Sequence, residues 1–155
     1  MARVLSSAFP SDTAGAAQPL ILHATCAAWQ GRAVLIGGAS GSGKSALGLA
    51  LLGWGCDLVA DDRTLLGVEG GALTARCPPR LQGLIEARGV GLLAARAVPE
   101  ARVALAVTLD SIETERLPPR RSISLLGIEI PFLHKVETAH FAAAILQYLK
   151  AGRSD

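Results

Sequence analysis

Apolar positions along this chain fall into short continuous runs and two stretches with helical spacing. Apolar runs at 20–29, 32–36, 56–60 and 102–109 predict buried strands. The segment 45–52, rich in Ala and Leu, predicts a helix, and a second, amphipathic helix is predicted over 138–150, where Phe141, Ile145, Leu146 and Leu149 share one face. Strands that alternate with helices predict an α/β fold.

Turn signals between the runs predict how the strands connect. Gln30-Gly31 separates the first two runs and predicts a hairpin, and Glu69-Gly70-Gly71 predicts a second hairpin. After the Pro78-Pro79 break, the segment 81–86 predicts a helical turn. The segment 122–130 predicts two short strands around its glycine, ended by Pro131.

The length and composition predict a single globular domain. The chain has 155 residues, of which 50% are hydrophobic and 18% charged, enough to bury a core without disulfides. Residues 1–17, rich in Ser, Ala, Gly and Pro, predict a loose tail, residues 18–150 the domain, and residues 151–155 a short C-terminal tail.

Charge and cysteine content exclude several classes of protein. A formal net charge of +2 is too small to make nucleic acid or an anionic membrane the main partner. The three cysteines have no metal-site or disulfide spacing, so reduced thiols in a cytoplasmic protein are expected. Prolines and Asp12 interrupt the N-terminal segment before it reaches the length of a signal or membrane-spanning sequence.

A glycine-rich loop between a predicted strand and a predicted helix carries the strongest functional signal. Its glycines, lysine and serine match the full phosphate-loop pattern, which binds a nucleoside triphosphate through backbone N–H groups, the lysine ammonium and a hydroxyl on Mg²⁺. The alternative, a flexible Gly/Ser loop, does not account for the flanking elements. The predicted nucleotide-binding residues are Gly38, Ala39, Ser40, Gly41, Ser42, Gly43, Lys44, Ser45 and Ala46.

Two adjacent carboxylates follow the apolar run at 56–60. Asp61 and Asp62 would lie at the carboxyl end of a strand, where open α/β sheets bind their ligands. Side chains of neighbouring strand residues point in opposite directions, so one carboxylate can serve a metal ion while the other serves proton transfer. The alternative is a solvated turn.

Three further residues have both a structural and a functional interpretation. His23 lies in an apolar run and is either a hydrogen-bonded core histidine or a catalytic group. Glu86 and Arg88 are either a surface ion pair or a metal ligand beside a phosphate-binding guanidinium. The residues alone leave both alternatives open.

In order along the chain, these pieces resemble the catalytic domain of the HPr kinase/phosphorylase family, the serine kinases of the phosphocarrier protein HPr. The resemblance covers roughly residues 20–95 and is carried by His23, the phosphate loop, Ala60-Asp61-Asp62-Arg63, Ala75-Arg76-Cys77-Pro78-Pro79 and 86–91. It implies a P-loop kinase-like α/β fold, shared with PEP carboxykinase-like proteins, in which helices flank a mixed sheet.

The resemblance also implies a role for each matching residue. Lys44 would hold the β- and γ-phosphates of ATP, and Ser45 and Glu86 would bind Mg²⁺. Asp62, with Asp61 as the second candidate, would take the proton from the acceptor serine of HPr, and His23 would assist beside them; Asp61 is otherwise a candidate metal ligand. Arg88 lies in a segment that the family uses in both directions of phosphate transfer.

The chain departs from the family pattern in two places. It has no counterpart of the separate N-terminal domain of long members, which resembles the short form found in alphaproteobacteria. Beyond Ile130, the segment 131–135 stands where the family has Pro-Gly-Arg-Asn, so the residue pattern does not support phosphorylase activity.

The expected activity is therefore ATP- and Mg²⁺-dependent phosphorylation of a serine of HPr by a cytoplasmic enzyme. The resemblance also implies a homo-oligomer, a hexamer in the family. Two alternatives remain open from the residues: a small-metabolite kinase with the same loop, and a regulatory module that binds ATP without transferring phosphate.

Overall fold

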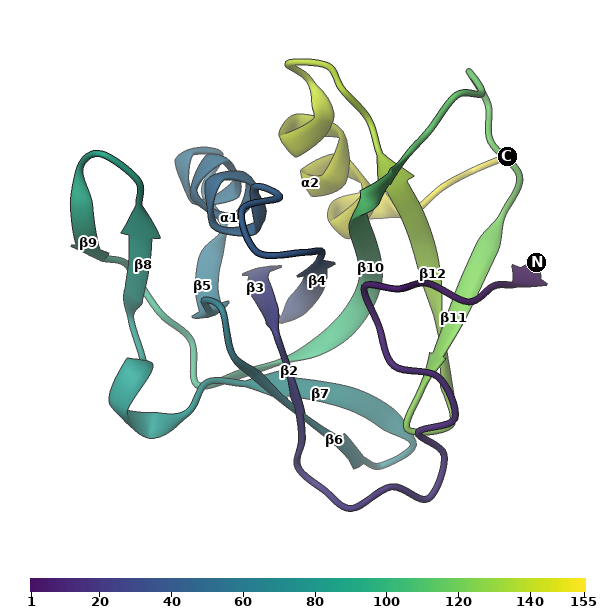
Figure 1. The fold of residues 1–155 in the computed structure, drawn as a ribbon, viewed down its shortest axis with the longest axis horizontal. Helices are drawn as coiled ribbons and strands as arrows, with labels where there is room; N and C mark the ends of the chain where they lie inside the picture. Colours follow the sequence, from purple (N-terminus) through teal and green to yellow (C-terminus); the bar gives the residue numbers. More distant parts are fainter.

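A ten-stranded mixed sheet forms the centre of the computed structural model, which describes residues 1–155 (Figure 1). Its strands are β1 (Ala2–Arg3), β2 (Leu20–Leu22), β3 (Ala24–Trp29), β4 (Arg32–Gly37), β5 (Asp57–Ala60), β6 (Thr64–Glu69), β7 (Ala72–Arg76), β10 (Glu100–Ile112), β11 (Arg121–Leu125) and β12 (Ile128–Lys135). The main path runs β1-β11-β12-β10-β4-β3-β5, and β7, β6 and β2 extend the sheet from β10. The predicted mixed α/β architecture is confirmed.

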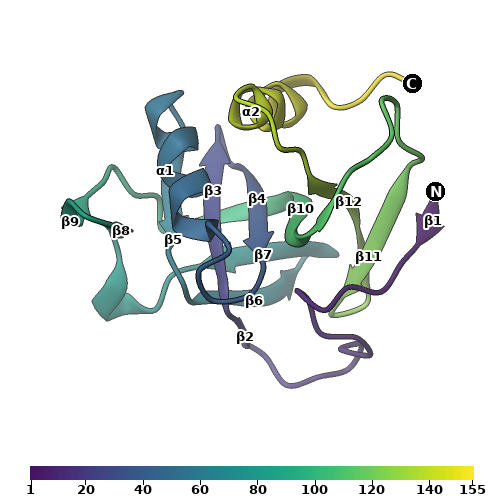
Figure 2. The ribbon, with the colours of Figure 1, turned by 45° about the horizontal axis from the view of Figure 1, so that its top comes forward.

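Both helices lie on the same face of the sheet. Helices α1 (Lys44–Gly53) and α2 (Phe141–Ala151) run side by side over β3 and β4 (Figure 2). The expectation of helices flanking the sheet is therefore met on one face only. Three strand pairs, β3–β4, β6–β7 and β11–β12, are antiparallel hairpins, which need no crossover helix. A one-turn helix, η1 (Pro79–Leu81), leads to a separate hairpin of β8 (Leu84–Ala87) and β9 (Gly91–Ala94).

Strand β4 is buried on both of its faces. Val34 and Ile36 pack with the apolar residues of α1 and α2, while Ala33 and Leu35 belong to a second core cluster on the opposite face of the sheet. Residues of β6, β7 and β12 complete that second cluster. Burial on both faces explains why this segment reads as a continuous apolar run, and it makes β4 a rigid base for the loop that follows it.

The first predicted hairpin is confirmed. β3 pairs with β4 in antiparallel register from Trp29–Arg32 onward, and Gln30 and Gly31 both have positive φ, +46° and +80°, as a two-residue type I′ turn requires. On its other side β4 pairs in parallel with β10. The carboxyl ends of β4 and β10 therefore meet at the same edge of the sheet.

The helical turn predicted for 81–86 is wrong. That segment contains only the end of η1, after which Gly83 adopts a φ of +77° and the chain enters β8. Along β8, Ile85 and Ala87 are buried and Glu86 is exposed, which is the alternation of a strand. The apolar spacing of Leu81, Leu84 and Ile85 resembled a helix because so short an apolar run fits both periods.

The strand end predicted at Pro131 is also wrong, because β12 continues to Lys135. Pro131 lies opposite Ser122 of β11, but the Ser122 carbonyl accepts a hydrogen bond from the N–H of Val4, the residue directly after β1. Ser122 and Pro131 are therefore a non-hydrogen-bonded pair, and the proline nitrogen points away from β11. Pairing with β10 begins only at Phe132, so no ladder bond is lost at the proline.

The N-terminal segment, expected to be loose, packs onto the sheet. β1 pairs in parallel with β11, and the Thr13 hydroxyl accepts a hydrogen bond from the backbone of Leu126. Phe9 is only 6% exposed, and its ring meets Phe132 edge-on with centroids 6.1 Å apart. A Cβ on Gly37, at the end of β4, would lie 2.8 Å from the Phe9 ring. The composition of residues 1–17 predicted a loose tail, but the buried Phe9 ring packs this segment against the core next to the end of β4.

We expect Phe9→Ala to lower the free energy of unfolding by about 3 kcal/mol, because it removes a buried ring and leaves a cavity. The matched control is Leu5→Ala, since Leu5 lies in the same segment but is 82% exposed and should change stability by less than about 0.5 kcal/mol. Urea denaturation measures both values. Equal stability of the two variants would mean that the segment does not pack as described.

Candidate active site

The phosphate loop joins the end of β4 to the first turn of α1. Gly43 precedes the helix with a φ of +104°, a conformation that favours glycine. No side chain caps the helix and its first turn holds no acidic residue. The first N–H groups of α1 therefore have no partner within the helix, and together with the helix dipole they favour an anion at this place.

Lys44 is a buried cation without a carboxylate partner. It is 6% exposed, and its Nζ donates to the carbonyl oxygens of Gly38, at 2.9 Å, and Ala39, at 3.1 Å. None of the ion pairs in the protein includes Lys44. An ammonium has three donors, so one N–H remains for another partner, and a buried charge that meets only neutral acceptors favours an anion there.

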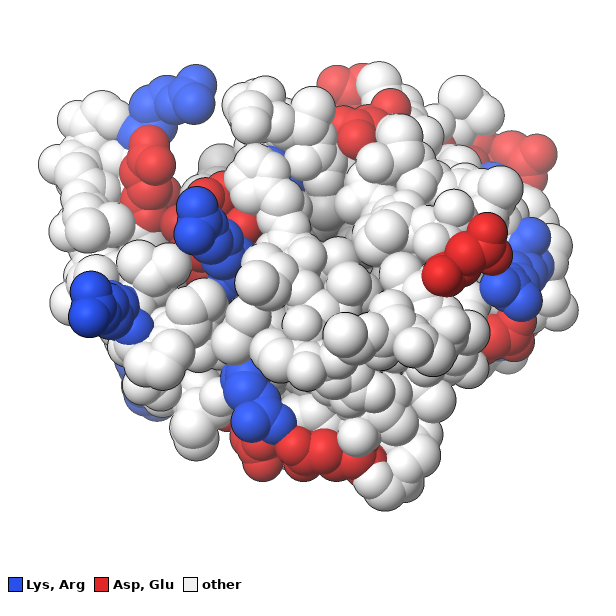
Figure 3. Space-filling model, turned by 60° about the horizontal axis from the view of Figure 1, so that its bottom comes forward, with Lys and Arg blue, Asp and Glu red and all other residues white.

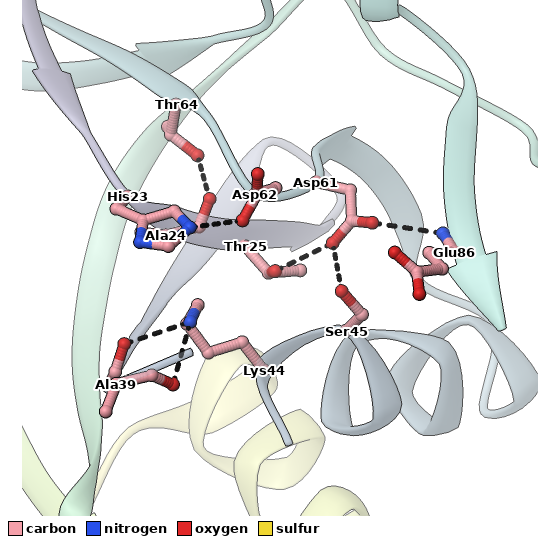
Figure 4. Close-up of polar contacts among 11 residues, drawn as sticks. His23, Ala24, Thr25, Ala39, Lys44, Ser45, Asp61, Asp62, Thr64 and Glu86 are labelled. Atoms are coloured by element: carbon pink, nitrogen blue, oxygen red, sulfur yellow. Dashed lines mark hydrogen bonds and ion pairs between the residues drawn. The ribbon is translucent and has the colours of Figure 1, made fainter. Parts of the chain in front are cut away.

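Asp61, directly after β5, connects to three other elements through one carboxylate (Figure 4). Its Oδ1 accepts hydrogen bonds from Thr25 Oγ1 of β3, at 2.8 Å, and from Ser45 Oγ of α1, at 2.7 Å, while its Oδ2 accepts from the Glu86 backbone N–H of β8, at 3.0 Å. Helix α1 approaches β3 closely because Gly48, one turn after Ser45, has no Cβ; a Cβ there would lie 2.7 Å from Thr25 Cγ2. The Asp61 carboxylate thereby fixes the Ser45 hydroxyl.

Asp62 lies in a strained turn directly after Asp61. Its φ is +65°, and the Arg63 N–H bonds to the Asp61 carbonyl at 2.7 Å, which makes a γ-turn with a positive central φ, a rare conformation. Thr64 holds the far side of this turn through a 2.8 Å hydrogen bond from its hydroxyl to the Ala24 carbonyl. The turn directs the Asp62 carboxylate away from Asp61 and towards His23, from whose Nε2 it accepts a hydrogen bond.

His23 is not a core histidine. It lies at the break between β2 and β3, and its side chain is 54% exposed, while that of Asp62 is 60% exposed. The break turns the imidazole out of the apolar strand and towards the cleft. The two aspartates thus have different partners, but the turn after β5, and not alternation along a strand, separates their side chains.

The β8–β9 hairpin forms one wall of a cleft of about 450 Å³ beside the loop, a volume typical of small-molecule sites. Glu86 and Arg88 both line this cleft and form no ion pair with each other. The other lining residues are His23, Ser40, Gly41, Gly43, Lys44, Ser45, Ala46, Leu49, Asp62, Ala87 and Val90. Most of the predicted site residues therefore share one cleft, although their roles remain predictions.

Four predicted residues do not line the cleft. Asp61 is covered by Ser45 and the Glu86 backbone, and Gly38 and Ala39 face the Lys44 ammonium through their carbonyls. The Ser42 hydroxyl is buried without a hydrogen-bond partner. Asp61 thus supports the cleft through the Ser45 hydroxyl, and the other three residues belong to the loop itself.

The proposed Mg²⁺ ligands have suitable chemistry. No group of three His, Cys, Asp or Glu side chains is arranged to hold a metal ion. Mg²⁺ usually takes only one or two carboxylates and completes its shell with phosphate oxygens and water. The hydrogen-bonded oxygens of Ser45 and Asp61, with Glu86 on the adjoining strand, fit that kind of site.

Sequence reasoning missed Asp110 and Thr25. The Asp110 carboxylate accepts a 2.9 Å hydrogen bond from the Ala39 N–H of the loop, and Thr25 supports Asp61. Asp110 follows the apolar run at 102–109, so the rule that selected Asp61 and Asp62, acidic residues directly after a buried strand, could have found it. Thr25 gave no signal, because a threonine inside an apolar strand is ordinary.

The thiols take no part in this site. Cys26, Cys56 and Cys77 are all free. Burial raises the pKa of Cys26 and, with the Asp57 carboxylate, raises that of Cys56 to about 11. Burial, followed by the charge of Asp61, also raises the pKa of Cys77. Raised pKa values keep all three as unreactive thiols at neutral pH.

The face seen in Figure 3 has no extended region of one charge, because its acidic and basic residues lie beside each other in small groups with uncharged surface between the groups. This distribution agrees with the small net charge. Neither helix has the length and hydropathy needed to span a membrane.

A mixed sheet with a lysine-bearing loop between a buried strand and an uncapped helix defines a phosphate-loop α/β domain. The chain belongs to the HPr serine kinase C-terminal domain family, whose model matches residues 15–134. The family resemblance seen in the sequence is thereby confirmed.

Similar proteins carry related names. The HPr kinase/phosphorylase of Cupriavidus necator is 38% identical over 121 residues, which are 70% of this chain and 37% of that protein. The HPr kinase/phosphorylase of Leptothrix cholodnii is 51% identical over 69 residues, 44% of this chain and 21% of that protein. This chain thus spans between 21% and 37% of the length of these two relatives. The structure of the Hpr(Ser) kinase/phosphatase from Coxiella burnetii matches with a TM-score of 0.68 and 27% identity, over 84% of this chain and 88% of that one.

We expect Asp61→Ala to lower the free energy of unfolding by about 2 kcal/mol, because three donors lose their shared acceptor. Amide hydrogen exchange at Glu86 should accelerate at the same time, since that N–H bonds to the removed carboxylate. Glu69→Ala is the control, because Glu69 pairs with Arg76 on the exposed surface and should change stability by less than about 1 kcal/mol. Unchanged amide exchange at Glu86 in the Asp61→Ala variant would mean that the Asp61 carboxylate does not bind the Glu86 N–H.

Proposed function

We propose that this chain is an ATP- and Mg²⁺-dependent kinase that phosphorylates a serine of an HPr-type phosphocarrier protein. The observation that carries the proposal is the arrangement of one cleft, with the Lys44 loop on one side and the Asp62–His23 pair on the other. Membership of an enzyme family whose relatives are named HPr kinase/phosphorylase supports the choice of acceptor.

The loop side of the cleft suits a triphosphate. The uncapped start of α1 offers backbone donors, and the free donor of the Lys44 ammonium suits the outer phosphates. Ser45, Asp61 and Glu86 would hold Mg²⁺, which when bound neutralises charge on the transferring phosphoryl group. Arg88, on the turn of the β8–β9 hairpin, would contribute a further positive charge beside that group.

The opposite side suits a protein hydroxyl. Asp62 is exposed, so a serine on the surface of a folded partner can reach its carboxylate. In the proposed step, the serine Oγ bonds to the γ-phosphorus, the bond from that phosphorus to the β–γ bridging oxygen breaks and ADP leaves. The proton of the serine hydroxyl passes to Asp62, whose carboxylate His23 orients.

The proposal covers the kinase direction only. The segment 131–135, where the resemblance would place a Pro-Gly-Arg-Asn stretch, is an ordinary part of β12 and contributes no residue to the lining of the cleft. We therefore assign no phosphorylase activity to this chain.

We expect Asp62→Asn to lower the rate of phosphate transfer to HPr by about a hundredfold or more, with MgATP affinity unchanged, because the asparagine cannot accept the proton. Lys44→Ala should abolish both MgATP binding and transfer, since it removes the buried charge. Asp12→Asn is a matched control, because Asp12 is another aspartate with positive φ, +52°, and lies in the N-terminal segment, outside the lining of the cleft. Phosphoserine on HPr, located by mass spectrometry, gives the rates.

The products separate the proposal from its alternatives. Label on a serine of HPr is the expected result. Label on a small metabolite instead of HPr, or MgATP binding without transfer to either, would contradict the proposed function. An Asp62→Asn variant with the rate of the unaltered chain would remove Asp62 from the base role.

A further inference from the structure

Strand β10 extends beyond the end of its partner β4, next to the phosphate loop. Their pairing ends where Thr108 meets Gly37. On the other side, the pairing of β10 with β12 shifts register between Thr108 and Ile112, so the intervening residues bulge out of the ladder. Two of these residues, Leu109 and Asp110, lie against the loop.

Both residues contact the loop from outside the nucleotide cleft. A Cβ on Gly38 would lie 3.2 Å from Leu109 Cβ, and the Leu109 side chain also borders Gly43. Asp110 Oδ1 accepts the Ala39 N–H at 2.9 Å, and the Asp110 N–H bonds to the hydroxyl of the fully buried Thr108 at 3.1 Å. Asp110 does not line the cleft, so it does not reach the reacting groups.

The peptide group between Gly38 and Ala39 is held from both sides. Its oxygen accepts from the Lys44 ammonium and its N–H donates to Asp110. Because the peptide is planar and trans, these two groups point in opposite directions and fixing one fixes the other. Rotation of this peptide would break both bonds and leave the Ala39 carbonyl as the one remaining acceptor that holds the Lys44 Nζ.

We propose that Asp110 is a positioning residue that orients the Gly38–Ala39 peptide and, through it, the Lys44 ammonium before nucleotide binds. The inference rests on the proposed function, because the value of a fixed ammonium lies in binding phosphates. A carboxylate is the stronger acceptor for this N–H, and its charge lies behind the loop rather than in the cleft.

Calorimetry with MgATP and with pyrophosphate tests the inference on the full chain and three variants. D110A removes the acceptor and should weaken MgATP binding about tenfold, since Lys44 loses its fixed position. D110N keeps an acceptor oxygen and should bind within about twofold of the unaltered chain. E129A controls for the loss of one negative charge, because Glu129 is exposed, lies outside the cleft and forms no ion pair.

A second readout needs no nucleotide. Amide exchange at Ala39 should be faster in D110A than in the unaltered chain, and D110N should restore the protection. If Asp110 had only a structural role, D110A would be less stable overall, amide exchange at Ala39 would not change separately, and D110N would not restore it.

The outcomes distinguish this inference from the proposed function. If D110A binds MgATP as tightly as the unaltered chain, or more tightly, the inference is overturned and the proposed function is not. Repulsion between the Asp110 carboxylate and the phosphates would then equal or exceed the gain from positioning. If the unaltered chain binds MgATP but transfers no phosphate to HPr, the proposed function fails while the D110A comparison still decides the inference. If the unaltered chain binds neither MgATP nor pyrophosphate, both fail.

Discussion

The arrangement of this site depends on one buried positive charge. Lys44 is almost fully enclosed at the start of α1, and only two loop carbonyls accept its hydrogen bonds. Burying an ammonium without a counter-charge is unfavourable, so the folded chain keeps a place at the loop where an anion lowers the free energy. The uncapped N–H groups of α1 face the same place and act in the same direction.

The carboxylates have separate positions around that charge. The Asp61 carboxylate accepts hydrogen bonds from Thr25, Ser45 and the backbone of β8. These bonds join the end of β5 to β3, to α1 and to the β8–β9 hairpin. Asp62 occupies a strained turn that aims it at His23. Strain of this kind persists only where the surroundings hold it, here through Thr64, and it is common at functional sites. Rigid support behind the site and exposed groups in front of it suit transfer to a large acceptor.

Sequence patterns predicted the parts of this protein that depend on local chemistry. The loop, both helices and the β3–β4 hairpin follow from glycine, lysine and apolar spacing, and the two aspartates follow from their place after a strand. The errors arose where distant contacts decide the structure. Pro131 continues a strand because the Ser122 carbonyl opposite it bonds to Val4 instead, and β8 is a strand because β9 pairs with it. Phe9 and Asp110 owe their roles to partners far away in the sequence, Phe132 and Ala39.

An NMR titration of the full chain with MgATP tests whether the buried Lys44 charge and the start of α1 form the binding place of a polyphosphate. We expect the largest amide shifts from Ser40 to Ala46, with smaller shifts at Asp62 and Glu86 across the cleft. Saturable shifts confined to another part of the chain, with the loop amides unchanged, would contradict it.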